Sequence, residues 1–166
     1  MLAAVEQQLA DEPFVVVGVH SPKFPTEGDA DLVREAVLRH GVTHPVVVDA
    51  GQRMWDAYGV RAWPTLVVVG ADGVIVGAAS GEPDREPLLA TLRAVLDRQR
   101  ALLRAAPLPL SPERPPPGAL AYPGGIAVGA DRVYVADTGH HQVVEYDGAG
   151  RELRRFGAGA PGLVDG

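Results

Sequence analysis

Residues 61–73 of this chain read RAWPTLVVVGADG, and this stretch decides the fold of the region around it. The apolar run at 66–69 predicts a buried strand, and Asp72-Gly73 predicts a tight turn into a second strand at 74–80. A proline directly before a buried strand is unusual, because its ring fixes φ and removes a backbone hydrogen-bond donor. Pro64 therefore needs a reason beyond strand formation.

Segments typical of alternating strands and helices surround this hairpin. Apolar runs of strand length stand at residues 14–20 (FVVVGVH) and 45–50 (PVVVDA), and such runs are typical of strands buried on both faces. Helical patterns stand at the start of the chain and at residues 28–41, 54–58 and 84–106. Helices between the early strands imply parallel crossovers, so we expect an α/β fold with an antiparallel hairpin near its end.

Two of these helices have clear apolar sides. In the helix at 28–41 we expect Leu32, Ala36 and His40 to lie along one side. The last helix presents on its apolar side Leu88, Leu92, Val95, Leu96, Leu102 and Leu103. The first helix begins at Met1 without a capping residue, which favours a natural start further upstream.

A proline-rich segment marks a boundary. Residues 106–118 read APLPLSPERPPPG and predict a semi-rigid linker. Beyond it, residues 119–166 contain four short β segments separated by Gly and Asp, which is about the length of one four-stranded propeller blade. A single blade cannot bury both of its faces, so we expect this part to be incomplete.

The composition is that of a globular protein and excludes several functions. The net charge is −6, and residues 119–166 carry four arginines against six acidic residues, which argues against nucleic-acid binding. No apolar stretch is long enough for a membrane helix and no secretory signal is visible, so we expect no membrane partner and a cytoplasmic location. The chain has no cysteine, which excludes disulfides, thiolate catalysis and cysteine metal sites within it.

Two stretches together carry a family resemblance. The first comprises FVVVGVHSPKF and PVVVDAGQRMWDAYGVRAWPTLVVVGADGVIVGAASGE, and the second reads YPGGIAVGADRVYVADTGHHQVVEYDGAGRELRRFG. The chain resembles proteins that fuse a thioredoxin-like domain, of the TlpA/redoxin or AhpC/TSA kind, to a propeller of NHL repeats. The resemblance implies a thioredoxin-like domain at 1–105 that lacks its first strand and active-site loop, the linker at 106–118, and one antiparallel NHL blade at 119–166.

The resemblance also implies a role for Pro64. In the thioredoxin family a cis proline at this place exposes the backbone of the preceding residue to an extended substrate beside the reactive disulfide. Carried onto this sequence, it implies a cis bond before Pro64 and a substrate-binding ledge of Trp63, Pro64 and Thr65, called the ledge below. Physics alone favours the trans form, because only about 5–6% of X-Pro bonds in folded proteins are cis.

Without a thiolate the ledge is a binding surface and not a reaction centre. We therefore expect no catalytic residue and no cofactor in this chain. The leading hypothesis is part of a thiol-disulfide oxidoreductase-like protein, redox-inactive as it stands, with a protein thiol or disulfide as partner and the NHL repeat as a protein-interaction module. The alternatives are a non-enzymatic scaffold for protein contacts and a fragment with no function of its own.

The blade sequence offers structural candidates. Asp137, Gly139 and His140 are expected to form an NHL turn in which the carboxylate of Asp137 accepts backbone amides. The adjacent His140 and His141 do not suit a shared metal ion, because neighbours on a strand point to opposite faces. No metal site is therefore expected.

The remaining candidates lie in the first hundred residues. His20 and His44 stand near strand ends, where a pocket could form, but a partly buried histidine with satisfied hydrogen bonds is the more common outcome. Trp55 and Tyr58 stand three residues apart on a short helix and are expected to anchor the core.

Overall fold

The computed structural model describes residues 1–104, 109–114 and 118–162. The chain divides into two compact units, one of residues 1–37 and 42–112 and one of residues 113–166 together with 38–41. Each unit is described by itself. Parts of the predicted linker, 106–108 and 115–117, lie outside the described residues.

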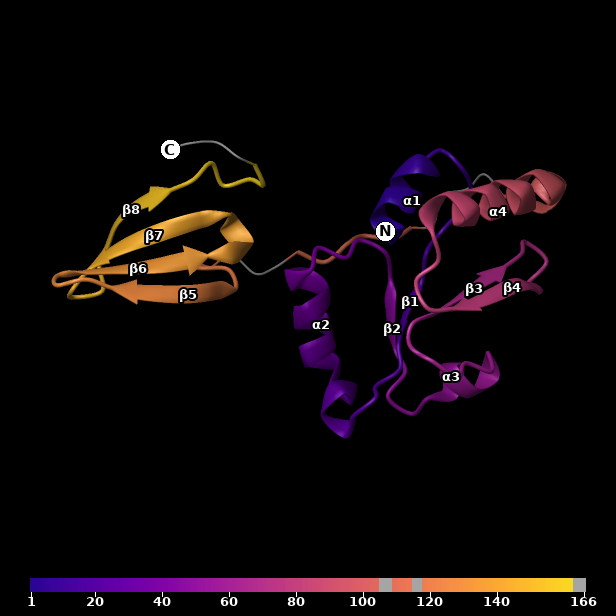
Figure 1. Cartoon of the computed structure of the whole chain (residues 1–166), viewed down its shortest axis with the longest axis horizontal. Helices are drawn as coiled ribbons and strands as arrows, with labels where there is room; N and C mark the ends of the chain where they lie inside the picture. Colours follow the sequence, from indigo (N-terminus) through magenta and orange to yellow (C-terminus); the bar gives the residue numbers. More distant parts are fainter. Residues whose placement is uncertain (105–108, 115–117, 163–166) are drawn as a thin grey trace. The chain divides into compact units, whose positions relative to one another are not determined.

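The order of elements agrees with the predicted alternation (Figure 1). In the first part of the chain the elements are α1 (Leu2–Gln8), β1 (Gly18–His20), α2 (Ala30–Arg39), β2 (Val46–Val48), α3 (Arg53–Ala57), β3 (Thr65–Val69), β4 (Ile75–Ser80) and α4 (Arg85–Arg98), with 3-10 turns at Pro25–Gly28 and Arg100–Leu102. The second unit contains β5 (Pro123–Val128), β6 (Arg132–Asp137), β7 (Gln142–Asp147) and β8 (Glu152–Phe156), with a 3-10 turn at Thr138–His140. The chain thus combines helices and sheets of mixed type.

The first unit has two small sheets. β1 and β2 pair in parallel, and β3 and β4 form the antiparallel hairpin that Asp72-Gly73 predicts. The turn is closed locally, because Asp72 Oδ1 accepts the backbone N–H of Val74 at 3.1 Å and Gly73 adopts a φ of 78°, which favours glycine. Within the described residues, no hydrogen-bonded ladder joins one pair of strands to the other.

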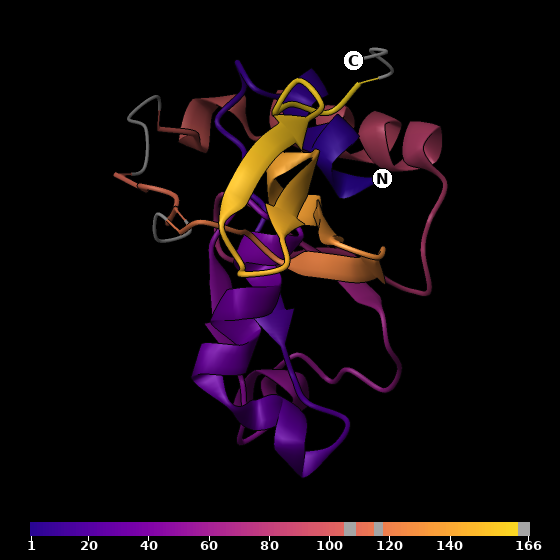
Figure 2. The same ribbon diagram turned by 90° about the vertical axis from the view of Figure 1, so that its left-hand side faces the viewer.

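The buried apolar cluster of the first unit lies between helices. Val5 and Leu9 from the first helical segment pack against the leucines of α4. The buried residues of this cluster are Val5, Leu9, Leu88, Leu89, Leu92 and Leu96. α1 and α4 lie beside each other in both ribbon views (Figures 1 and 2), so the amphipathic patterns of the two helices supply the core of this unit.

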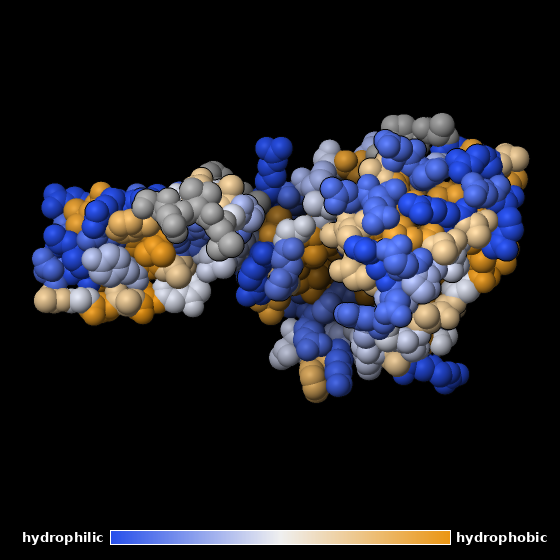
Figure 3. Space-filling view, turned by 45° about the horizontal axis from the view of Figure 1, so that its top comes forward, coloured by the Kyte–Doolittle hydropathy of each residue, from blue (hydrophilic) through white to orange (hydrophobic). Residues whose placement is uncertain are grey.

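The strands are less buried than the sequence predicts. The runs at 14–20 and 45–50 were expected to be covered on both faces, but Val15, Val17, Val19 and Val47 are exposed. β1 and β2 are also short, at three residues each. The expectation is wrong because the apolar helix faces pack against each other, so that one face of the β1–β2 pair is left open. Figure 3 shows hydrophobic residues among hydrophilic ones on the visible surface.

Two helix predictions also need correction. α2 buries Val33, whereas Leu32 and His40 are exposed, so its inward side is rotated by about one residue from the predicted one. α4 ends at Arg98 rather than near residue 106, because Gln99 leaves the helical conformation and a 3-10 turn follows. Leu102, which was assigned to its apolar side, is exposed.

The second unit is a four-stranded antiparallel sheet in the order β5-β6-β7-β8, as the four β segments predict. Val135 and Val144 lie directly opposite each other on the two central strands, and both are buried. The strand direction turns progressively across the sheet (Figure 2), as expected of twisted antiparallel strands. The four strands form one contiguous sheet in sequence order, like a single blade.

Candidate functional site

The backbone of the predicted ledge is only partly paired within the described residues. The Trp63–Pro64 peptide bond is cis, as the resemblance implies. Pro64 C=O accepts the N–H of Gly81 at 2.8 Å, and Thr65 Oγ1 donates to the carbonyl of Ala62 at 2.7 Å. Among the described residues, neither the backbone N–H nor the C=O of Trp63 has a hydrogen-bond partner. One donor and one acceptor are therefore available directly before β3.

The side chain of Trp63 is held on one edge and open on the other. Its indole Nε1 donates a hydrogen bond of 2.9 Å to the backbone carbonyl of Ser21. Its ring lies against Trp55, with ring centroids 4.1 Å apart and planes tilted by 33°. The side chain is nevertheless 49% exposed. The indole is thus held by a hydrogen bond and a ring contact in a residue that is about half exposed to solvent.

A buried carboxylate lies behind this indole. Asp49, at the end of β2, is 5% exposed. Its Oδ2 accepts the hydroxyl of Ser21 at 2.8 Å and the backbone N–H of Trp55 at 3.0 Å, and its Oδ1 accepts the N–H of Met54 at 3.0 Å. Asp49 therefore connects the end of β1 to the first turn of α3. Trp55, which is partly buried, belongs to this turn.

Hydrogen bonds favour the ionised form of this carboxylate over its neutral form. Burial by itself would raise the pKa of Asp49, but the bonds from the Met54 and Trp55 amides and the Ser21 hydroxyl outweigh burial and lower the pKa below its ordinary value. Neither Asp49 nor Ser21 is among the site residues that the sequence predicts. The available signal was a polar residue directly after an apolar strand run, which places it at a strand end where sites are often built.

The predicted core anchors of α3 behave differently from expectation. Tyr58 is exposed rather than buried, and Trp55 is partly buried against the ring of Trp63. The prediction is wrong because α3 is only five residues long and lies outside the helix–helix core. Trp55 therefore contacts Trp63 instead of the helix–helix core.

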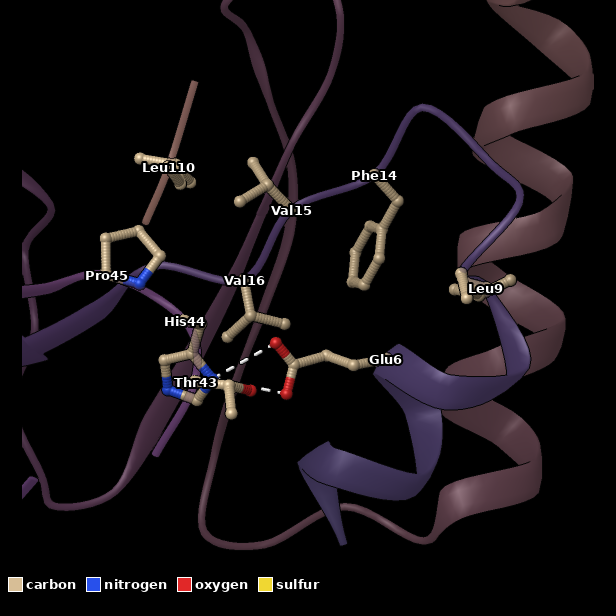
Figure 4. Close-up of a pocket in the computed structure, with 10 residues that line it drawn as sticks. Glu6, Leu9, Phe14, Val15, Val16, Thr43, His44, Pro45 and Leu110 are labelled. Carbon is tan, nitrogen blue, oxygen red and sulfur yellow. Dashed lines mark hydrogen bonds and ion pairs between the residues drawn. The ribbon is translucent and has the colours of Figure 1, made fainter. Parts of the chain in front are cut away.

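A small pocket forms beside His44, one of the two histidines that the sequence places near strand ends (Figure 4). It has a volume of about 190 Å³ and is walled mostly by apolar side chains, among them Phe14, Val16 and Leu110. The Nδ1 of His44 lies 3.1 Å from a carboxylate oxygen of Glu6. The imidazole thus has its hydrogen bond satisfied by a carboxylate from α1.

His20 also has a local partner. Its Nε2 lies 3.0 Å from the backbone carbonyl of Glu27 in the 3-10 turn that follows β1. Both histidines therefore have satisfied hydrogen bonds. No group of three or more His, Asp or Glu side chains within the described ranges is arranged to hold a metal ion.

The second unit buries the carboxylate of Asp137 completely. Oδ1 accepts the backbone N–H of Ala121 at 2.6 Å, while Oδ2 lies 2.7 Å from His140 Nδ1 and accepts Arg155 Nη1 at 3.0 Å. The amide belongs to Ala121, sixteen residues earlier, and not to the turn of Asp137 itself. Burial would raise the pKa of Asp137, but these hydrogen bonds outweigh burial and lower it.

Gly139 lies in the turn that follows Asp137 and is packed closely. Its N–H donates to the carbonyl of Ala121 at 2.8 Å. A Cβ at this position would come within 2.8 Å of the Ala121 side chain and 2.9 Å of its carbonyl oxygen. The predicted turn residues Asp137, Gly139 and His140 therefore meet at one end of the sheet, around the segment that enters β5.

A second carboxylate cluster was not foreseen from the sequence. Glu145 on β7 is 5% exposed and accepts hydrogen bonds from Arg154 and from the hydroxyl of Tyr134, with Arg132 3.3 Å away. The bond from Arg154, aided by the other two groups, lowers the pKa of Glu145 despite its burial. The alternation of β strands places these side chains on one face, because residues directly opposite each other share a face.

Comparisons with known proteins find one family model and several relatives. The NHL repeat family matches residues 120–146, which lie within the second unit. The chain is 36% identical to NHL repeat-containing protein 2 of Bos taurus over 99% of its length, but this covers 24% of that relative. It is also 36% identical to the Arabidopsis thaliana protein SUPPRESSOR OF QUENCHING 1, chloroplastic, over 84% of the chain and 14% of the relative. The chain is therefore similar to an NHL repeat-containing protein over almost all of its own length.

A further relative matches part of the chain. The thiol-disulfide oxidoreductase ResA of Bacillus thuringiensis (strain Al Hakam) is 32% identical over 84 residues, which is 45% of this chain and 49% of the relative. The chain spans about a quarter of the length of the NHL repeat-containing relative from Bos taurus. Within the described ranges, no helix has the length and apolar character needed to cross a bilayer.

Proposed function

We propose that the first unit is a thioredoxin-like domain whose ledge binds an extended polypeptide, and that the second unit is an NHL interaction module. The observation that carries the proposal is the open backbone of Trp63, whose N–H and C=O have no partner among the described residues, next to a half-exposed indole. The similarity to a relative named as a thiol-disulfide oxidoreductase supports the same function. The expected ligand is a protein thiol or disulfide in an extended segment.

The binding chemistry follows from main-chain pairing. An extended segment can donate to the Trp63 carbonyl and accept from the Trp63 N–H, as in strand addition to a sheet. The fixed indole then offers an apolar surface to one side chain of the ligand. Because thiol-disulfide exchange requires thiolate attack on sulfur and the chain has no cysteine, we propose binding without exchange by this chain alone.

Binding of an extended main chain is tested with reduced, S-carboxymethylated ribonuclease A, an unfolded polypeptide that lacks tryptophan and whose blocked cysteines exclude thiol-disulfide exchange. The chain contains two tryptophans, Trp55 and Trp63, so its fluorescence reports on the ledge region. We expect saturable quenching or shift of this fluorescence, together with a change in the backbone amide signal of Trp63 in ¹H–¹⁵N spectra. Saturating probe without either change would refute the proposal.

A matched pair of variants locates the contact. Trp63→Ala removes the half-exposed indole, and Phe24→Ala removes another exposed aromatic ring of the same unit. We expect the probe's Kd, followed by calorimetry, to rise only for Trp63→Ala. An insulin-reduction assay tests the redox part, and disulfide reduction by the purified chain would contradict it.

A second candidate function is a protein-binding scaffold in which the blade makes the main contact. It is favoured by the 70% and 73% exposure of Ile126 and Val128 on the edge strand β5. If Ile126→Ser abolishes binding of the unfolded probe and Trp63→Ala does not, this alternative replaces the first. For either function, a cytoplasmic location stays a prediction.

A further inference from the structure

We propose that Asp49 is the positioning residue of the ledge: it holds the indole of Trp63 in its half-exposed orientation through two separate arms, one through Ser21 and one through Trp55. The residues of this arrangement, called the Asp49 cluster, are Asp49, Ser21, Trp55 and Trp63. The orientation of the indole follows from contacts within the chain. Its use in ligand binding rests on the proposed function.

The first arm runs through the residue after β1. Ser21 is buried, and its hydroxyl donates to Asp49 Oδ2 at 2.8 Å. The backbone carbonyl of the same residue accepts the indole N–H of Trp63 at 2.9 Å. Because one residue makes both bonds, fixing its side chain on Asp49 also fixes the acceptor that faces Trp63. The backbone is tied here as well, since the N–H of Asp49 donates to the carbonyl of His20 at 2.9 Å.

The second arm runs through the first turn of α3. Both oxygens of Asp49 accept backbone amides there, from Met54 and Trp55, each at 3.0 Å. These amides would otherwise lack partners at a helix start, and a carboxylate is well placed to accept them. The amide of Trp55 belongs to the residue whose ring lies against Trp63. The position of this second ring therefore also depends on Asp49.

The two arms reach different parts of the Trp63 side chain. The Ser21 arm holds the polar edge of the indole, and the Trp55 arm holds its ring by aromatic contact. A ring held in this way has little conformational entropy left to lose when a ligand binds, so its affinity is higher than that of a free ring. Asp49 itself is 5% exposed and its oxygens are occupied within the fold, so it acts through these contacts and not by touching the ligand.

The cluster is tested with three variants whose changes are matched. Asp49→Asn keeps the shape of the side chain but removes its charge and half of its acceptor capacity. Ser21→Ala cuts the first arm alone and leaves the capping of α3 intact. Asp56→Asn is the control, because it makes the same chemical change on α3, and no side-chain hydrogen bond of Asp56 to a described residue is present.

The measurement is the indole N–H signal of Trp63 in ¹H–¹⁵N spectra, one of two such signals in the chain. This signal should not change if Asp49 only stabilises the fold and does not position Trp63. We expect Ser21→Ala and Asp49→Asn to shift this signal and to speed its exchange with solvent, with amide signals of α4 unchanged. For binding of carboxymethylated ribonuclease A we expect Kd to rise about tenfold in Asp49→Asn, as for loss of hydrogen bonds to a charged group, and less in Ser21→Ala. Asp56→Asn should match the wild type in both.

The outcomes separate this inference from the proposed function. If Asp49→Asn does not fold, Ser21→Ala alone decides, since it leaves both α3 amide bonds in place. An unchanged Trp63 indole signal in the folded variants overturns the inference. A shifted indole signal with unchanged probe affinity also overturns it, because the orientation would then not serve binding. If the wild-type chain fails to bind the probe while the variants shift the indole signal, the proposed function is refuted and the positioning of Trp63 by Asp49 is upheld.

Discussion

The two units differ in the number of carboxylates that they bury: among the described residues the first buries Asp49, and the second buries Asp137 and Glu145. In the first unit the buried cluster is apolar and lies between α1 and α4. In the second unit two carboxylates, Asp137 and Glu145, are buried within a four-stranded sheet and are paired with arginine and histidine. Apolar burial is insensitive to pH, whereas a buried ion pair depends on the charge of both partners. Acid should therefore act more strongly on the second unit, and loss of apolar core side chains on the first, in which Asp49 is the acid-sensitive buried group.

The largest expected effect is that of acid on the second unit. Hydrogen bonds and ion pairs hold the pKa values of Asp137, Glu145, Asp147 and Glu152 below their ordinary values. A folded-state pKa that is lowered contributes stability above the unfolded-state pKa of about 4, and this stability is lost as pH falls through the folded-state value. We therefore expect the amide signals of β6 and β7 to collapse as pH falls below about 4, at a higher pH than those of α4.

This prediction is checked by ¹H–¹⁵N spectra recorded across the pH range at constant salt. High salt is the control, because it screens exposed pairs more than buried ones. Simultaneous loss of the α4 and β6–β7 signals at every salt concentration would contradict a difference between the units.

The next largest effect should come from the apolar core of the first unit. Leu89 on α4 is 1% exposed, so Leu89→Ala removes packed methyl groups and leaves a cavity. We expect the free energy of unfolding of this unit to fall by about 2–5 kcal/mol. Urea unfolding followed by tryptophan fluorescence measures it, because both tryptophans belong to this unit. Leu32→Ala, on an exposed position of α2, should change it by less than about 0.5 kcal/mol.

The elements of both units could be predicted from local patterns, but their burial could not. Asp72-Gly73 sets its own turn and the alternation of strands and helices sets the pairing, so hairpin and blade followed from neighbouring residues. The exposure of Val17 and Val19 depends on which surfaces remain to cover them, and periodicity carries no information on that. The prediction of which side of α2 is buried was wrong for the same reason.

The candidate site divides in the same way. The place of Pro64 before a strand was visible in the sequence, and a cis bond stands there. Asp49 and Ser21 were missed because their partnership joins residues 28 positions apart across two strand ends. The pairing of Glu145 with Arg154 was missed too, because it depends on strand register that no local motif specifies.

Removing one charge from the second unit should have an intermediate effect. Asp137→Asn leaves the shape of the fully buried side chain but weakens its bonds from Ala121, His140 and Arg155. We expect a loss of about 1–3 kcal/mol, as for a buried polar group with incomplete hydrogen bonding. Hydrogen exchange of β6 and β7 measures it, and α4 should keep its wild-type protection. Asp131→Asn, at an exposed pair with Arg132, is the control, and an equal effect there would show that burial of Asp137 does not matter.

The smallest loss of stability should come from removing a polar link on the surface of the first unit. This link allows apolar and polar stabilisation to be compared within one unit. Gln99, directly after α4, accepts the backbone N–H of Ala71 at 2.6 Å and donates to Asp72 Oδ2 at 3.3 Å. It thereby ties the β3–β4 turn to the end of the helix, but the contacts are exposed and water can replace them. Gln99→Ala should therefore cost about 0.5–1.5 kcal/mol and should speed exchange of the turn amides, while the helix amides near Leu89 are unaffected. Arg93→Ala, on the exposed side of α4, should leave the turn amides unchanged. A loss in Gln99→Ala as large as that in Leu89→Ala would mean that the hairpin is held by this polar link and not by the helix–helix core, and the distinction between the two units would no longer stand.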